Sequence, residues 1–167
     1  MTSPLAGLNV IYARSRNFCI GKNGGLPWSL PLEYQHFENI TQGFPLIMGR
    51  KSYQDHDGLL PNSLNIIVSS QASLVQEPDA EVTNNLENAI KIATSNSPSF
   101  FVIGGATLID TTISDAVCVY ETIVDAEIDG DTFINTPVFS AWHTTELLRQ
   151  EADISHQYGF VAYQHQR

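Results

Sequence analysis

Glu33 is the side chain whose surroundings first suggest chemistry. It follows an apolar segment over residues 26–32, and a spacing of four residues places it on one helical face with Phe37. A carboxylate among apolar neighbours is costly unless it meets a cation or hydrogen-bond donors. One interpretation is that its charge only stabilises a helix N-terminus. The other is a buried acid that binds a ligand carrying paired N–H donors.

Three expected strands end in small residues and then turn into a helix or a loop. The segments are Gly49-Arg50-Lys51-Ser52, Ser69-Ser70 and Gly104-Gly105-Ala106-Thr107. Ligands bind beyond the carboxyl ends of strands in open α/β sheets, where helix N-termini present free N–H groups. The spacing matches neither a P-loop nor the Rossmann glycine motif, and a Gly-Gly pair alone is often only a tight turn. Together the three segments predict a phosphate-bearing cofactor along one sheet edge.

Hydrophobic patterning predicts the elements that must position these residues. Strands are expected over 8–13, 45–48, 64–68, 100–103 and 117–123, and near 132–133, 143–145 and 158–164. Helices are expected over 31–41, 50–55, 86–93 and 106–113. Residues 15–31 contain three glycines and two prolines and predict a long loop, which in a compact domain is usually functional. The order predicts an α/β fold with a mixed sheet, in a single domain over residues 1–167.

Composition excludes several classes of partner. The 167 residues carry 8 basic and 18 acidic side chains, a net charge of −10, which disfavours nucleic acids and anionic membranes. No apolar run approaches the ~20 residues of a membrane span, and no signal peptide is evident, so a cytoplasmic protein is expected. Cys19 and Cys118 lack metal-site spacing, so two unpaired thiols and no metal site are expected.

Five motifs, in order, resemble the dihydrofolate reductase family. They are Ile20–Trp28, with its Leu-Pro-Trp ending, Ile47–Tyr53, the stretch from Leu60-Pro61 to Ser70, Val102–Gly105 and Asp125–Thr132. The resemblance covers nearly the whole chain. It implies a mostly parallel eight-stranded sheet flanked by about four helices. It also implies an NADPH-dependent monomer that reduces 7,8-dihydrofolate to tetrahydrofolate, with hydride transfer to pterin C6 and protonation at N5.

The resemblance also assigns residues to the expected site. Catalytic positions would be Glu33, Trp28 and Thr122, with Glu33 bonded to N3 and the 2-amino group of the pterin. The substrate pocket would comprise Ala13, Glu33, Tyr34, Phe37, Leu60, Ile103, Tyr120 and Thr122. NADPH would contact Ala13, Ile20, Gly49, Arg50, Lys51, Ser52, Ser69, Ser70, Gly104, Gly105, Ala106 and Thr107. The loop from Asn23 to Trp28 would close over the rings, braced by Asp131, and the Gly104–Gly105 peptide would be cis.

Two positions depart from the family pattern. Ser63 stands where the family usually has an arginine that holds the α-carboxylate of the substrate's glutamate tail. A charge-assisted pair of this kind is worth about 1.5–3 kcal/mol, so weaker dihydrofolate binding or a substitute cation is expected. His36 and His56 are the nearest candidates in sequence. Ile109 stands where many members have a tyrosine beside the nicotinamide, which predicts an altered cofactor affinity.

Three alternatives stay open on the sequence. The chain could reduce a smaller dihydropterin without the glutamate tail, which Ser63 suggests. It could be a catalytically silent relative that binds ligands, although Glu33, Trp28 and Thr122 are all retained. As an antifolate target, it could also show weakened inhibition by trimethoprim, because Tyr34, His36 and Ile109 are unusual neighbours of the pocket.

Overall fold

The computed structural model describes residues 4–55, 60, 62–70 and 80–167. Its strands are β1 (Leu8–Ser15), β2 (Cys19–Gly21), β3 (Leu46–Gly49), β4 (Asn65–Val68), β5 (Glu81–Thr83), β6 (Phe100–Gly104), β7 (Cys118–Val124), β8 (Thr132–Phe133), β9 (His143–Gln150) and β10 (Phe160–Gln166). Its helices are α1 (Pro31–Thr41), α2 (Arg50–Asp55), α3 (Leu86–Asn96) and α4 (Ala106–Thr112), followed by a 3₁₀ turn over Ile113–Asp115.

Eight strands form one mixed sheet in the order β5-β4-β3-β6-β1-β7-β10-β9. The pairs from β5 to β7 are all parallel, and β10 runs antiparallel to both β7 and β9. The carboxyl ends of six neighbouring strands therefore meet at one edge. This is the edge where the sequence predicted a binding site.

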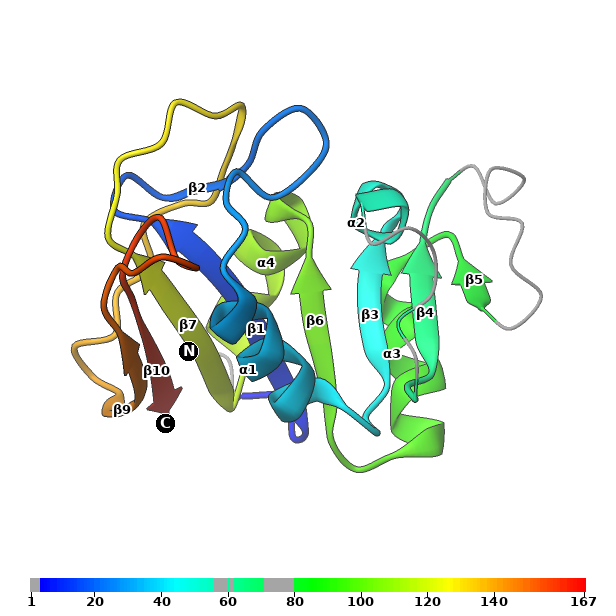
Figure 1. Ribbon diagram of the computed structural model, residues 1–167. Coiled ribbons are helices and arrows are strands. Elements are labelled where there is room, and N and C mark those ends of the chain that lie inside the picture. Colours follow the sequence, from blue (N-terminus) through cyan, green and yellow to red (C-terminus); the bar gives the residue numbers. More distant parts are fainter. Residues whose placement is uncertain (1–3, 56–59, 61, 71–79) are drawn as a thin grey trace.

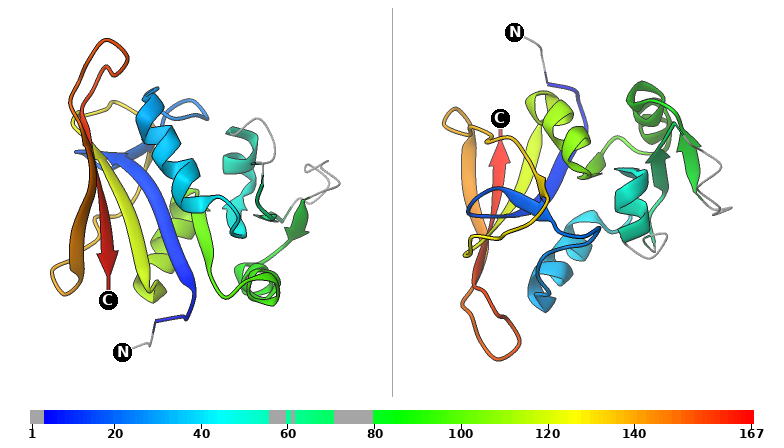
Figure 2. Two further views of the ribbon diagram at one scale, coloured as in Figure 1. Left: turned by 60° about the horizontal axis from the view of Figure 1, so that its bottom comes forward. Right: turned by 90° about the horizontal axis from the view of Figure 1, so that it is seen from above.

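Helices cover both faces of the sheet. Figure 2 shows α1 and α2 on one face and α3 and α4 on the other. The α3/α4 face buries the largest apolar cluster, which includes Val10, Ile66 and Phe100. On the α1 face, Ile11 and Met48 pack with partly buried Phe37. The central strands are apolar on both faces, as parallel strands between two helical layers require.

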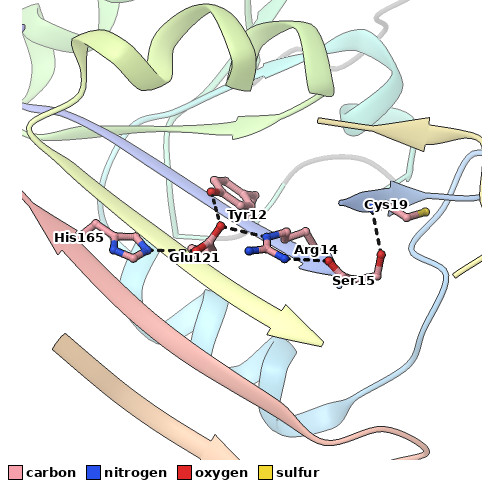
Figure 3. Close-up of polar contacts among 6 residues, drawn as sticks. All are labelled: Tyr12, Arg14, Ser15, Cys19, Glu121 and His165. Atoms are coloured by element: carbon pink, nitrogen blue, oxygen red, sulfur yellow. Dashed lines mark hydrogen bonds and ion pairs between the residues drawn. The ribbon is translucent and has the colours of Figure 1, made fainter. Parts of the chain in front are cut away.

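A polar network lies within the sheet beneath the end of β1 (Figure 3). Glu121 accepts hydrogen bonds from the Tyr12 hydroxyl at 2.7 Å and from Arg14 Nε at 3.0 Å. Its other oxygen lies 3.1 Å from His165 Nε2. Burial alone would raise the pKa of Glu121, but His165, Arg14 and Tyr12 hold the pKa below its usual value. The network links β1, β7 and β10 through residues that neighbour Ala13 and Thr122 in the chain.

Most expected elements are confirmed, with differences at the ends and in short strands. The expected eight-stranded sheet and four helices are present. The stretch 15–31 is not wholly a loop, because β2 forms there and pairs with β8 in a separate two-stranded sheet. β5, which the sequence pattern missed, has only three residues and pairs with β4 at the sheet edge. α3 continues to Asn96, three residues beyond the expected end.

Candidate active site

A cavity opens beside α1, and its lining residues on the central strands lie close to the carboxyl ends of those strands. Figure 1 shows α1 lying over these strands. Residues of β1, β6, β7, α1 and the preceding loop line the cavity: Ile11, Tyr12, Ala13, Leu26, Glu33, Tyr34, His36, Phe37, Ile103 and Thr122. Six expected substrate-site residues, Ala13, Glu33, Tyr34, Phe37, Ile103 and Thr122, are thus brought together from four elements. The cavity is mostly apolar, which suits the faces of an aromatic ring.

Glu33 is buried in this cavity, with 7% of its surface exposed. Burial raises its pKa from 4.5 to about 7, and the nearby Trp28 indole opposes part of that rise. The Trp28 N–H is itself buried and makes no hydrogen bond with any residue that the structure describes. An acid that is easily protonated, next to an unsatisfied donor, fits a site completed by a polar ligand.

The first turn of α1 fixes the position of Glu33. Pro31 occupies the first turn, where its missing N–H costs nothing, but Leu30 at the N-cap offers no side-chain cap. Instead the backbone N–H of Leu32 donates to His156 Nε2 at 3.2 Å, and His156 Nδ1 lies 2.9 Å from Asp153. Because Nε2 accepts, Nδ1 carries the proton toward Asp153. Sequence reasoning missed His156, since it lies 124 residues from its partner.

Glycines from two neighbouring strand ends approach each other beside the cavity. A Cβ on Gly104 would lie 2.6 Å from Ser52 Oγ, and Gly104 has a φ of +153°. A Cβ on Gly49 would lie 3.8 Å from the Gly105 nitrogen. The Gly104–Gly105 peptide is cis, as expected. The starts of α2 and α4 thus lie side by side, and the free backbone N–H groups of helix starts suit a phosphate-bearing ligand.

The other residues expected at the cofactor lie along the same edge. Arg50 is half-buried and Lys51 exposed in the first turn of α2, and Ala106 and Thr107 begin α4. Ser69 and Ser70 follow β4, the neighbour of β3, and Ser69 N–H donates to Thr83 of β5. Ile20 packs partly buried against the core from β2. These residues fit a dinucleotide laid across β4, β3 and β6.

A second cavity shares Phe37 with the first and extends along α1. It is lined by Phe37, Glu38, Thr41, Gln42, Leu46, Leu60, Asn62 and Ser63. Leu60 is held there because its N–H and C=O both bond the Asn65 carboxamide at 2.9 Å. Pro61 and His56 lie outside the described residues.

Tyr120 does not line either described cavity. Its hydroxyl accepts a hydrogen bond from Gln164 Nε2, its ring packs near Phe101, and burial raises its pKa to about 12. His36 does line the first cavity, and burial lowers its pKa, so it offers no cation there at neutral pH. Ile109 lies on α4, and its side chain is fully buried in the core.

The loop before α1 is tied to the segment that carries Asp131. Asn23 N–H donates to Asp131 Oδ2 at 2.8 Å, and Asp131 N–H donates to the carbonyl of Gly21. Leu26, half exposed at the cavity mouth, belongs to the same loop. The expected contact between Asp131 and the loop is therefore present.

Cys19 and Cys118 are unpaired and buried, as expected. Among the described residues, no helix combines the length and apolarity needed to cross a membrane. Within the same residues, no group of three or more His, Cys, Asp or Glu side chains is arranged to hold a metal ion. The fold and the site define an α/β protein with a dinucleotide-type sheet edge beside a ring-sized cavity that contains one buried carboxylate.

Comparison with known proteins narrows this class to one family. A family model described as dihydrofolate reductase matches residues 7–167. The dihydrofolate reductase of Enterococcus faecium is 30% identical over 153 residues, which cover 89% of this chain and 92% of that protein. Dihydrofolate reductase type 3 of Salmonella typhimurium is 31% identical over 162 residues, 96% and 99% of the two chains. The chain belongs to the dihydrofolate reductase family.

The fold of this chain also resembles that of a solved structure. Dihydrofolate reductase from Enterococcus faecalis, complexed with NADP(H) and RAB-propyl, has a TM-score of 0.85 and 26% identity to this chain. The match covers 96% of this chain and 95% of that one. The expected fold class is therefore confirmed over nearly the whole molecule.

Proposed function

We propose that this chain reduces 7,8-dihydrofolate to 5,6,7,8-tetrahydrofolate with NADPH. The observation that carries the proposal is the buried Glu33 in an apolar cavity whose lining includes Ile103, the residue before Gly104 at the paired strand ends. A pterin ring presents paired N–H donors to a carboxylate, and a dinucleotide needs close backbone approach at helix N-termini. Both requirements are met at adjacent positions on one sheet edge.

The residues of the chain would bind and orient the substrate. Glu33, with Thr122 nearby, would hold N3 and the 2-amino group of the pterin. The flat walls of the cavity would be Ala13, Phe37 and Ile103, and Tyr34 and Leu60 would contact the aminobenzoyl group. Tyr120, expected at this pocket from the family resemblance, lies outside the cavity lining. Trp28 and the loop from Asn23 would exclude water from the reacting rings.

NADPH would lie along β4, β3 and β6. Arg50, Lys51, Ser52, Ser69 and Ser70 would hold its phosphates, Gly104–Thr107 its pyrophosphate, and Ile20 and Ala13 the nicotinamide end. When bound, the cofactor supplies a hydride to pterin C6, while N5 takes a proton. The raised pKa of Glu33 suits an acid that orients and polarises the pterin near neutral pH.

The test is direct. Purified protein should lose NADPH absorbance when 7,8-dihydrofolate is added, and no loss at saturating substrate would remove the proposal. We further propose a single domain over residues 1–167 that acts as a cytoplasmic monomer. Sedimentation at micromolar concentration should give a mass near the 18.4 kDa of the chain, and a dimer would contradict this part.

A further inference from the structure

Positive charge is missing from the second cavity. All eight lysines and arginines of the chain fall within the described residues, and none of them lines either cavity. The one charged side chain among its lining residues is Glu38, exposed on α1 one residue beyond Phe37. The described residues that line this cavity are therefore neutral or acidic.

The hydroxyl groups of this cavity are already engaged with the backbone. Thr41 Oγ1 donates to the carbonyl of Phe37 at 2.8 Å, and Ser63 Oγ lies 3.5 Å from the carbonyl of Thr41. Neither is therefore placed to donate to an anion without losing its contact. Gln42 and Asn62 contribute carboxamides, which can both donate to and accept from a neutral amide.

The two cavities share Phe37, so a substrate whose ring meets Glu33 would extend its tail past Glu38. A carboxylate there would face another carboxylate within a protein of net charge −10. Like charges repel, and no lysine or arginine lines the cavity to compensate. We propose that this enzyme reduces dihydrofolate but binds reduced pterins with uncharged tails more tightly, and that Glu38 and Ser63 determine this preference. The inference rests on the proposed reductase function.

The test compares three substrates that differ at the tail: 7,8-dihydrofolate, its glutamate diamide of nearly equal size, and tail-free 7,8-dihydrobiopterin. At low salt, KM for dihydrofolate should exceed that for the diamide about threefold to tenfold, and the ratio should shrink at ~0.5 M salt. An equal or lower KM for dihydrofolate would overturn the proposal.

Variants assign the effect to residues. Glu38→Gln should lower KM for dihydrofolate about twofold to fivefold and leave the diamide unchanged. Ser63→Arg should lower KM for dihydrofolate about tenfold or more. Glu87→Gln, which removes an exposed carboxylate from α3, is the matched control. It should change neither KM for dihydrofolate nor KM for the diamide. Equal effects of Glu38→Gln and Glu87→Gln would reject the local role of Glu38.

Binding separates this proposal from the reductase function itself. Dissociation constants for the same three pterins, from quenching of tryptophan fluorescence, should show the same preference for the neutral tail without turnover. Absence of NADPH oxidation with every substrate would reject the reductase function. A binding preference for the dianionic tail would reject the specificity, whether or not turnover occurs.

Discussion

At position 33 the protein keeps a carboxyl group where water solvates its charge poorly. Burial raises its pKa from 4.5 to about 7, so between these values the folded chain retains a proton that the unfolded chain has released. The free energy of unfolding therefore falls as pH rises through this window. Across the whole window, the free energy of unfolding falls by about 3 kcal/mol.

Glu33→Gln removes this dependence. Relative to wild type, the unfolding free energy of the variant should increase by about 3 kcal/mol between pH 4.5 and pH 8, measured by urea titration at both pH values. Glu38→Gln, an exposed position on the same helix, is the control and should follow wild type. Parallel pH profiles for wild type and Glu33→Gln would show that the carboxyl group is not desolvated.

The same substitution should separate stability from activity. Because glutamine cannot carry the charge that the pterin N–H groups meet, kcat/KM with NADPH and dihydrofolate should fall about 100-fold or more. Steady-state rates near pH 7 measure this. A loss below fivefold would mean that another group orients the substrate.

At the scale of elements, α1 depends on a cap from the other end of the chain. His156→Ala leaves the Leu32 N–H without its acceptor and should lower the unfolding free energy by about 1 kcal/mol. Since Glu33 lies one residue further along, KM for substrate should also rise. His156→Gln supplies an amide oxygen and should recover part of both losses. Equal losses in the two variants would argue against capping.

The strands behind the site are joined by the network around Glu121. Glu121→Leu leaves the Arg14 guanidinium without its buried partner and also removes the acceptor of Tyr12. Unfolding free energy should fall by about 3–5 kcal/mol. Glu121→Gln keeps an acceptor oxygen and should cost less. Chemical denaturation measures the unfolding free energy of both variants. If Glu121→Leu is as stable as wild type, the buried network does not stabilise the strands.

At the scale of the whole molecule, the cofactor edge and the substrate cavity meet at the end of β6. Gly104→Ala would place a methyl group 2.6 Å from Ser52 Oγ at a φ of +153°. The variant should unfold at lower urea concentration and bind NADPH more weakly, measured by titration of cofactor fluorescence. Adding Ser52→Gly should restore part of the stability by removing the contact. Full stability in Gly104→Ala alone would show that the two strand ends separate readily.

Residue pattern predicted seven of the eight strands of the main sheet and its four helices, and the family resemblance supplied the number of strands. The predicted strands and helices follow from local hydrophobic periodicity, and the family motifs in order identified the site residues, including Glu33 and Gly104. The residue pattern did not predict β2 and β5, because each has only three residues and forms through pairing with a distant strand.

Only the tertiary structure decided which distant groups act on the site. The hydrogen bond from Leu32 to His156 and the buried network around Glu121 join residues 44 to 124 positions apart. Local sequence carries no signal for such contacts, because chain folding and not spacing brings the partners together. The pKa of Glu33 likewise depends on burial, a property of the packed molecule. Sequence named the acid, and packing set how strongly it holds its proton.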